Sequence, residues 1–128
     1  MIQNGSFLNV VDNSGAKSAC CIRVLDGYRR RYARSGDIIL VSIKTVRRKK
    51  KKLNSKVKKG DVVRALIVRT RFGNRRPFSE TITHTENAVI LLNKQNKLLG
   101  TRIFGSLSRD FRFTPFLKSL TISSGVLV

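Results

Sequence analysis

Short apolar runs separated by turn signals fill most of the chain before residue 100, and they limit it to short β-strands. The runs are rich in β-branched residues and span residues 8–11, 18–25, 38–46, 62–70, 81–83 and 88–92. Between them lie turn sequences such as Asp12-Asn13-Ser14-Gly15 and Gly60-Asp61. Asp and Asn side chains accept hydrogen bonds from nearby backbone N–H groups and Gly tolerates positive φ, so these residues favour turns. Five or six such strands predict a mainly β chain that folds into a small closed or nearly closed barrel.

From residue 100 onward, the apolar residues follow mixed helical spacings instead. Ser106 and Ser108 are candidate helix caps, and Pro115 disfavours a helical conformation for the residue before it. We therefore predict one or two short helices interrupted near Pro115. Residues 120–122 are predicted to add a final short strand.

The charge of the chain restricts its partners. Twenty-seven Lys and Arg face seven Asp and Glu, which gives a formal net charge of +20 and an isoelectric point near 11.5. Such a surface attracts polyanions, so RNA or DNA is the expected partner. An anionic membrane would require an amphipathic helix or an anchor, and no run approaches the roughly 18 apolar residues of a membrane span. We expect no membrane partner.

The basic residues form two Arg-rich loops and one Lys-rich segment. Arg guanidinium groups can bind phosphate bidentately, and the rings of Tyr28 and Tyr32 beside Arg29-Arg30-Arg31 can stack on bases. Nine of the thirteen residues from 47 to 59 are Lys or Arg, which is typical both of a solvated, mobile loop and of an arm that orders on phosphates. We predict fixed RNA contacts in the Arg loops and looser charge neutralisation in the Lys segment. The predicted RNA-binding residues are Arg29, Arg30, Arg31, Tyr32, Arg34, Lys44, Arg47, Arg48, Lys49, Lys50, Lys51, Lys52, Lys56, Lys58, Lys59, Arg69, Arg71, Arg75 and Arg76.

The residue types that carry catalysis are sparse. His84 is the only histidine, and it lies between two threonines. Asp12, Asp26, Asp37 and Asp61 belong to turn sequences, which explains them better than acid–base chemistry does. Cys20 and Cys21 are adjacent and have no spaced Cys or His partners, so they do not form a zinc site. We predict no catalytic residue, metal or cofactor.

The N-terminal residues 1–16 lack the features of a secretory signal peptide and of an Arg-rich transit peptide. We therefore expect the chain to be made and used inside a cell or organelle.

A set of ordered motifs resembles one known family, ribosomal protein fourteen of the large subunit in its bacterial and organellar form. The resemblance runs from the first residue nearly to the last, and the order and spacing of the motifs make it specific. The motifs are Met1-Ile2-Gln3, Leu8-Asn9-Val10, Asp12-Asn13-Ser14-Gly15-Ala16, Arg30-Arg31-Tyr32-Ala33, Gly36-Asp37-Ile38-Ile39, Val57-Lys58-Lys59-Gly60-Asp61-Val62, Val68-Arg69-Thr70, Arg75-Arg76-Pro77, Asn87-Ala88, Leu91-Leu92-Asn93 and Gly100-Thr101-Arg102-Ile103-Phe104-Gly105.

The resemblance implies a single ribosomal-protein domain over residues 1–128. Its five-stranded closed barrel would occupy residues 1–99, with a protruding basic β-ribbon at 44–60 and a short C-terminal helical region at 100–128. The resemblance further implies a non-enzymatic, structural constituent of the large ribosomal subunit, a ribonucleoprotein of translation. It would bind large-subunit rRNA at the face that meets the small subunit and help form an intersubunit bridge with small-subunit rRNA.

The resemblance also implies protein partners, namely large-subunit proteins three and nineteen and a ribosome silencing factor. The silencing factor would dock on a C-terminal surface that carries Thr101, Arg102, Phe104 and Lys118 here.

The chain departs from the family pattern at several places. The Lys-rich segment is longer than usual, and Phe78-Ser79 replaces the usual Asp-Gly turn, so that either Phe78 exposes its ring to a partner or the hairpin turns differently. These departures favour an organellar version, mitochondrial and encoded there, with a bacterial cytoplasmic origin as the alternative. The alternative function is an extraribosomal RNA chaperone or single-strand binder, which would need aromatic side chains across an open sheet face.

Overall fold

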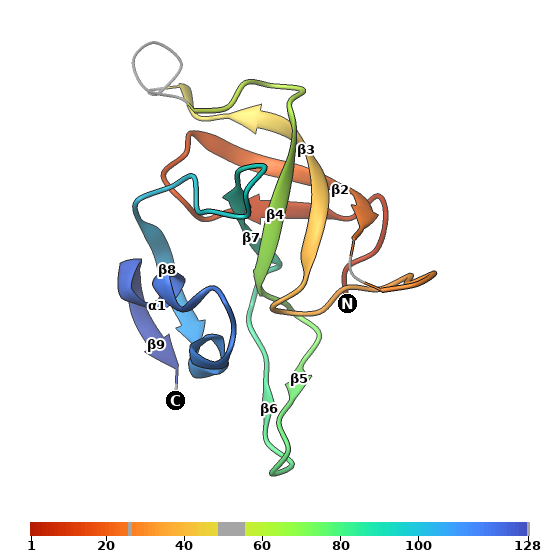
Figure 1. The fold of residues 1–128 in the computed structure, drawn as a ribbon, viewed down its shortest axis with the longest axis vertical. Helices are drawn as coiled ribbons and strands as arrows, with labels where there is room; N and C mark the ends of the chain where they lie inside the picture. Colours follow the sequence, from red (N-terminus) through yellow and green to blue (C-terminus); the bar gives the residue numbers. More distant parts are fainter. Residues whose placement is uncertain (26, 49–55, 128) are drawn as a thin grey trace.

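Five strands close into a barrel in the order β1-β2-β3-β4-β7. The computed structural model describes residues 1–25, 27–48 and 56–127 (Figure 1). Antiparallel pairings join consecutive strands, and a parallel pairing of β1 with β7, with Asn9 opposite Ala88, closes the ring. The predicted five-stranded closed barrel is therefore confirmed. Its strands are β1 Phe7–Val10, β2 Ala16–Val24, β3 Ile38–Val46, β4 Val62–Arg69 and β7 Ala88–Leu92.

The barrel core follows from the two-residue period of a strand. Along β3, Ile39, Val41 and Ile43 are fully buried, while the residues between them are half-buried. Small residues of β2, including Ala19 and Cys21, pack in the same cluster. Cys20 is more exposed than Cys21, as expected for neighbours that point to opposite faces of a strand.

Strand β7 and residues 65–69 of β4 are buried on both faces, which explains the continuous apolar runs at 65–68 and 88–92. Ile67 and Leu91 belong to the barrel core, whereas their neighbours Leu66, Val68 and Ile90 belong to a second cluster. That cluster is completed by Leu107, Phe111 and Leu120 from the C-terminal segment, which lies against the outside of the barrel (Figure 1). The segment consists of strand β8 Ile103–Ser108, the 3-10 helix η2 Arg109–Phe113, the helix α1 Leu117–Ile122 and strand β9 Ser123–Leu127.

The C-terminal segment confirms two predictions and corrects two. Two short helices flank Pro115, and the Ser108 hydroxyl caps η2 by accepting a hydrogen bond from the Asp110 N–H. The predicted cap at Ser106 is wrong, because this residue lies within β8. The predicted strand at 120–122 is also wrong. These residues close α1, where Leu120 is buried in the second cluster, and the last strand begins at Ser123.

The parallel pairing of β8 with β9, which brings Leu107 opposite Val126, was not predicted. The two strands are separated by two helices, so the pairing depends on contacts between residues distant in sequence.

Between β4 and β7, two short strands form a ribbon that projects from the barrel (Figure 1). It consists of β5 Asn74–Arg75 and β6 Thr81–Ile82, paired antiparallel. The strand predicted at 81–83 is therefore part of this ribbon. Of the basic ribbon predicted at 44–60, residues 49–55 lie outside the described residues, so that ribbon stays a prediction.

One buried carboxylate ties the first turn to the barrel wall. Asp12 is 1% exposed, and its Oδ2 accepts a hydrogen bond from the Leu91 N–H of β7 at 2.9 Å. Its Oδ1 accepts hydrogen bonds from the N–H and the hydroxyl of Ser14. The Asp12 carboxylate therefore accepts hydrogen bonds both from β7 and from the turn that follows β1.

We predict that Asp12→Ala destabilises the fold. The substitution leaves the Leu91 and Ser14 N–H groups without their acceptor, at a cost of about 1–3 kcal/mol for each buried donor. Urea denaturation followed by circular dichroism measures the loss. The control is Asp61→Ala, which removes a similar turn carboxylate from the exposed Lys58 N–H. An effect at Asp12 no larger than that at Asp61 would contradict the assignment.

Candidate nucleic-acid interface

The barrel topology brings the two Arg-rich loops to one end of the molecule. One loop joins β2 to β3 and the other joins β4 to β7, and the alternating strand directions place both connections at the same end. Hydrogen bonds confirm the proximity, because Gly36 N–H donates to Ile67 O at 2.8 Å and the Ser35 hydroxyl donates to Val68 O at 3.3 Å. We call residues 27–37 and 70–87 the arginine end.

The Lys-rich segment leaves β3 at the opposite end of the barrel. Arg47 N–H donates to Gly15 O at 2.9 Å, and the Lys56 ammonium donates to Leu99 O at 2.6 Å. We call residues 44–48 and 56–61 the lysine end. Lys49, Lys50, Lys51 and Lys52 lie outside the described residues. The sequence predicted both kinds of cluster but not their separation to opposite ends, which depends on strand order.

Arg30 shapes the first arginine loop from within. Its Nη2 forms an ion pair with Asp37 Oδ2 at 2.6 Å, and its Nε donates to Tyr32 O at 3.0 Å. The same Asp37 oxygen accepts a hydrogen bond from the Arg34 N–H at 2.7 Å. One carboxylate thus holds both the loop backbone and the Arg30 guanidinium in place.

The other charged groups of this loop face solvent. Arg29, Arg31 and Arg34 are exposed, and the Arg29 guanidinium lies 5.3 Å from the centroid of the Tyr28 ring. Tyr28 is 88% exposed and Tyr32 is 47% exposed. The loop therefore presents guanidinium groups and aromatic rings together, the combination that stacks on bases and binds phosphates.

Arg69 was predicted to contact RNA, but the structure places its side chain inside the protein. It is 7% exposed, and its Nη1 donates to Phe104 O at 3.0 Å and to Ser106 O at 3.2 Å. Its Nη2 pairs with Glu86 Oε1 at 3.0 Å, while its buried Nε has no hydrogen-bond partner among the described residues. Arg69 ends β4 on the outer face, where β8 covers it, so it holds the C-terminal segment to the barrel.

Gly105 permits this approach of Arg69 to β8. Its φ of +85° lies in the left-handed region, and a Cβ there would lie 2.0 Å from Arg69 Nη1. Any side chain at position 105 would therefore displace the guanidinium.

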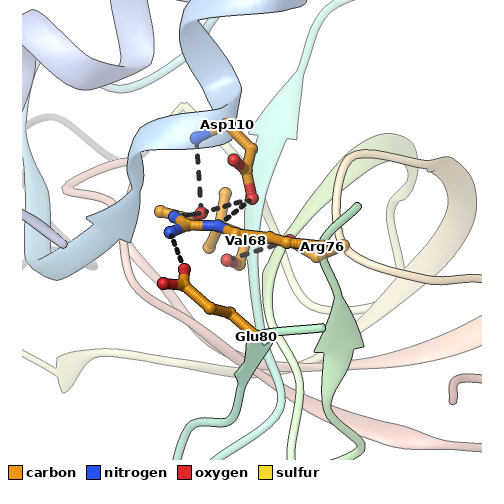
Figure 2. A network of polar contacts seen from close by, with 6 residues as sticks. Val68, Arg76, Glu80 and Asp110 are labelled. Carbon is orange, nitrogen blue, oxygen red and sulfur yellow. Dashed lines mark hydrogen bonds and ion pairs between the residues drawn. The ribbon is translucent and has the colours of Figure 1, made fainter. Parts of the chain in front are cut away.

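Arg76 is likewise engaged with protein groups. Its Nη1 pairs with Glu80 Oε2 and its Nε pairs with Asp110 Oδ2, each at 3.2 Å (Figure 2). The Arg76 side chain is only 11% exposed, whereas Arg71 and Arg75 of the same loop are exposed residues. Arg71 also donates from Nε to Thr85 O at 2.8 Å, which leaves its terminal nitrogens at the surface.

At the lysine end, the predicted residues Lys44, Arg48, Lys58 and Lys59 are exposed. Arg47 is half-buried, with its guanidinium 5.4 Å from the centroid of the Phe104 ring. The lysine end thus reaches the first strand of the C-terminal segment.

The acidic residues neutralise little of the exposed positive charge. Asp37, Glu80, Glu86 and Asp110 form ion pairs with Arg30, Arg69 or Arg76, the arginines that organise the fold. Asp12 is buried. The remaining exposed Lys and Arg residues therefore keep a field of one sign, which steers polyanions to the surface.

Burial shifts the pKa of two residues of types that often act in catalysis, His84 and Cys21. Burial is the main cause that lowers the pKa of His84, and nearby Arg69 lowers it further while Glu86 opposes it. Burial, aided by Cys20, raises the pKa of Cys21 to about 11, so its thiol stays protonated at neutral pH. The described residues contain no group of three or more His, Cys, Asp or Glu placed to hold a metal ion. They also contain no helix long and apolar enough to span a membrane.

The predicted protein-binding residues lie on the C-terminal segment. Thr101 precedes β8 and is fixed by Asn13, whose Oδ1 accepts the Thr101 N–H at 2.7 Å. Arg102 is exposed beside it, Phe104 of β8 is 44% exposed, and Lys118 is exposed on α1. The structure thus brings the first three together, and Lys118 follows on a separate element.

Sequence patterns missed two exposed rings at the arginine end. Phe7 at the start of β1 is 70% exposed, and Phe72 after β4 is 53% exposed. The position of Phe7 follows only from the strand order. Phe7 pairs with Cys20 in the second half of β2, which leads into the first arginine loop, so β1 begins near the arginine end.

We predict that Arg69→Leu loosens the C-terminal segment. The variant loses charge-assisted hydrogen bonds to two carbonyls and an ion pair, and we expect a loss of stability on the order of 2–3 kcal/mol. Thermal denaturation gives the size, and hydrogen exchange should show lost protection in β8 and β9. Arg75→Leu, at an exposed site, is the control. Unchanged protection of β8 in Arg69→Leu would contradict the role of this residue.

Comparison with known proteins agrees with this arrangement. A family model described as Ribosomal protein L14p/L23e matches residues 1–127, and the match includes the barrel and the C-terminal segment. Members of this family are structural, non-enzymatic constituents of the large ribosomal subunit, and they work among rRNA and other ribosomal proteins. The chain therefore belongs to the ribosomal protein L14p/L23e family of the large ribosomal subunit.

Proposed function

We propose that this protein binds large-subunit rRNA through its arginine end. The observation that carries the proposal is the gathering of the exposed residues Arg29, Arg31, Arg34, Arg71 and Arg75 at one end of the barrel, beside exposed aromatic rings. Guanidinium groups fix phosphates with defined geometry, and rings accept unstacked bases. Binding would need no turnover, because charge neutralisation and shape-matched contact are enough to hold an RNA segment in place.

The lysine end would make a second RNA contact. Its proposed contacts are Lys44, Arg47, Arg48, Lys56, Lys58 and Lys59. Lys49, Lys50, Lys51 and Lys52, which lie outside the described residues, are proposed as further RNA contacts. The two ends lie on opposite sides of the barrel, so two RNA segments can be held at once without competing. This arrangement supports the proposed intersubunit bridge, in which one contact is with large-subunit rRNA and the other with small-subunit rRNA.

The C-terminal segment would meet protein partners. Thr101, Arg102, Phe104 and Lys118 are proposed to receive a silencing factor, and large-subunit proteins three and nineteen are the proposed neighbours on the ribosome. The segment shares an apolar cluster with β4 and β7, which supports a single domain over residues 1–128. The proposed location is an organellar ribosome, mitochondrial rather than bacterial, because the departures from the family pattern gather in the Lys-rich segment and at Phe78-Ser79.

Sucrose-gradient sedimentation of lysate from the native source tests the ribosomal role. We expect the protein to co-migrate with large subunits and intact ribosomes and to remain there in moderately high salt. A peak at the top of the gradient, or release by mild salt, would favour an extraribosomal RNA binder. That result would overturn the structural role on the subunit.

We predict that replacing Arg29 and Arg31 with Ala weakens rRNA binding and reduces its salt dependence. Each lost phosphate contact should reduce the slope of log affinity against log salt by roughly 0.7–0.9. Filter binding of large-subunit rRNA at several salt concentrations measures the slope. Arg30 is retained because its pair with Asp37 holds the loop.

The matched control replaces Arg109 and Arg112, two exposed residues of η2, and changes the net charge equally. Equal slopes in both double variants would show that total charge, rather than the arginine end, determines binding.

A further inference from the structure

The tip of the β5–β6 ribbon displays an aromatic ring in solvent. Phe78 is 90% exposed, and Ser79 beside it has a φ of +66°, in the left-handed region that few residues other than Gly adopt. A single exposed apolar residue is common on protein surfaces and needs no special explanation. Phe78 differs from such a residue because hydrogen bonds and ion pairs hold the ribbon that carries it.

The tip is closed by hydrogen bonds around Phe78. Arg76 N–H donates to Glu80 O at 2.8 Å, and Ser79 N–H donates to Arg76 O at 3.2 Å. At the base of the ribbon the two strands approach so closely that a Cβ on Gly73 would lie 2.3 Å from Thr81 Cγ2. Main-chain hydrogen bonds therefore close the turn around the ring, and close packing of Gly73 on the Thr81 side chain holds the base of the ribbon.

A side-chain brace fastens the ribbon to the C-terminal segment (Figure 2). The Arg76 guanidinium lies between two carboxylates and pairs with Glu80 of the ribbon and with Asp110 of η2. Asp110 Oδ2 in turn accepts a hydrogen bond from the Ser108 hydroxyl at 2.9 Å. The residue two positions before Phe78 is thus anchored to the barrel cover, which limits the motion of the tip.

The charge around the tip selects the kind of partner. Arg75 is exposed on the same ribbon, Arg71 is exposed three residues before β5, and the nearby carboxylate of Glu80 is already paired with Arg76. A positively charged surface around a rigid ring favours a polyanion that offers flat apolar faces. RNA offers such faces only where bases are unpaired, in loops, bulges and ends, because bases inside a helix cover one another.

We propose that the β5–β6 ribbon is a pre-organised stacking platform that places Phe78 on an unpaired base of RNA. The inference rests on the proposed RNA binding and specifies its target as unpaired rather than helical RNA. Stacking of one base on an aromatic side chain changes affinity by about 5- to 150-fold when the ring is removed. The backbone that carries the ring is already held by hydrogen bonds, so little backbone freedom is lost on binding.

The experiment measures binding to two labelled RNA hairpins of equal nucleotide number that share the same loop. The stem of one carries an unpaired bulge, and the stem of the other is fully paired, so the loop contributes equally to both. Fluorescence anisotropy gives the affinities, and a 2-aminopurine in the bulge reports stacking by its quenching. We expect the wild-type protein to prefer the bulged hairpin. Phe78→Ala should lose about 5- to 150-fold in affinity for that hairpin, lose the quenching, and bind the paired hairpin unchanged.

Three further variants make the result specific. Phe78→Tyr keeps a ring and should keep the preference, whereas Phe113→Ala removes an equally exposed ring, 88% exposed in η2, and should change neither affinity. Asp110→Asn weakens the brace on Arg76 and should reduce the preference for the bulge while leaving the affinity for the paired hairpin unchanged.

The outcomes separate the inference from the proposed function. If the wild-type protein and Phe78→Ala both bind the two hairpins with equal affinity, the proposal of a stacking platform is overturned, while the proposed RNA binding stands. If neither hairpin nor large-subunit rRNA is bound, the proposed function itself fails. If Phe78→Ala binds both hairpins normally but leaves large subunits in a sucrose gradient, the ring contacts a protein, and the inference is again overturned.

Discussion

The burial of β7 and of residues 65–69 of β4 on both faces is the constraint on which the rest of the structure depends. A barrel of five strands needs only one apolar face per strand, yet Leu66, Val68 and Ile90 add a second apolar surface on the outside. That surface must be covered, since exposing it to water would cost roughly 25 cal/mol for each Å² of apolar area. The C-terminal segment covers it with Leu107, Phe111 and Leu120. The barrel and this segment therefore share one apolar cluster, and Arg69 strengthens their junction with buried hydrogen bonds to the carbonyls of Phe104 and Ser106 in β8.

The same covering arrangement divides the arginines into two groups. Where a guanidinium lies beneath the C-terminal segment, as Arg69 does, it is surrounded by carbonyls and a carboxylate and serves the fold. Where the loop extends beyond the barrel end, as at Arg31 and Arg75, the group stays exposed and available to phosphate. Few acids are present, and the ion pairs of the described residues engage Arg30, Arg69 and Arg76, so the exposed arginines of the second group remain unneutralised. Burial thus identifies Arg69 and Arg76 as structural, whereas the exposed Arg30 is identified by its ion pair with Asp37.

The sequence predicts the local parts of this structure well and the assembled parts less well. The bounds of β3 and β7 match the predicted runs at 38–46 and 88–92, because alternation and turn residues act within a few positions. By contrast, β8 and β9 pair across two helices, and the mixed spacing of Leu107, Phe111 and Leu120 was interpreted as helical although Leu107 lies in a strand. The candidate site shows the same limit. The exposure of Arg29 and Arg31 could be predicted from the local composition of their loop. The burial of Arg69 and the exposure of Phe7 could not, because they depend on which strands are neighbours.

Arg76 shows how fold and interface are connected in this molecule. Its sequence context, a basic loop, suggests a phosphate contact, but its guanidinium bridges the ribbon and η2 through Glu80 and Asp110. Because η2 also contributes Phe111 to the cluster over β4 and β7, the ribbon is linked through one side chain to the apolar contact that unites the barrel with its cover. A projecting hairpin of two short strands would be marginal by itself, since isolated two-stranded ribbons are barely stable in water. The brace supplies the missing support, and a positively charged element that reaches toward a partner can therefore be rigid without being buried.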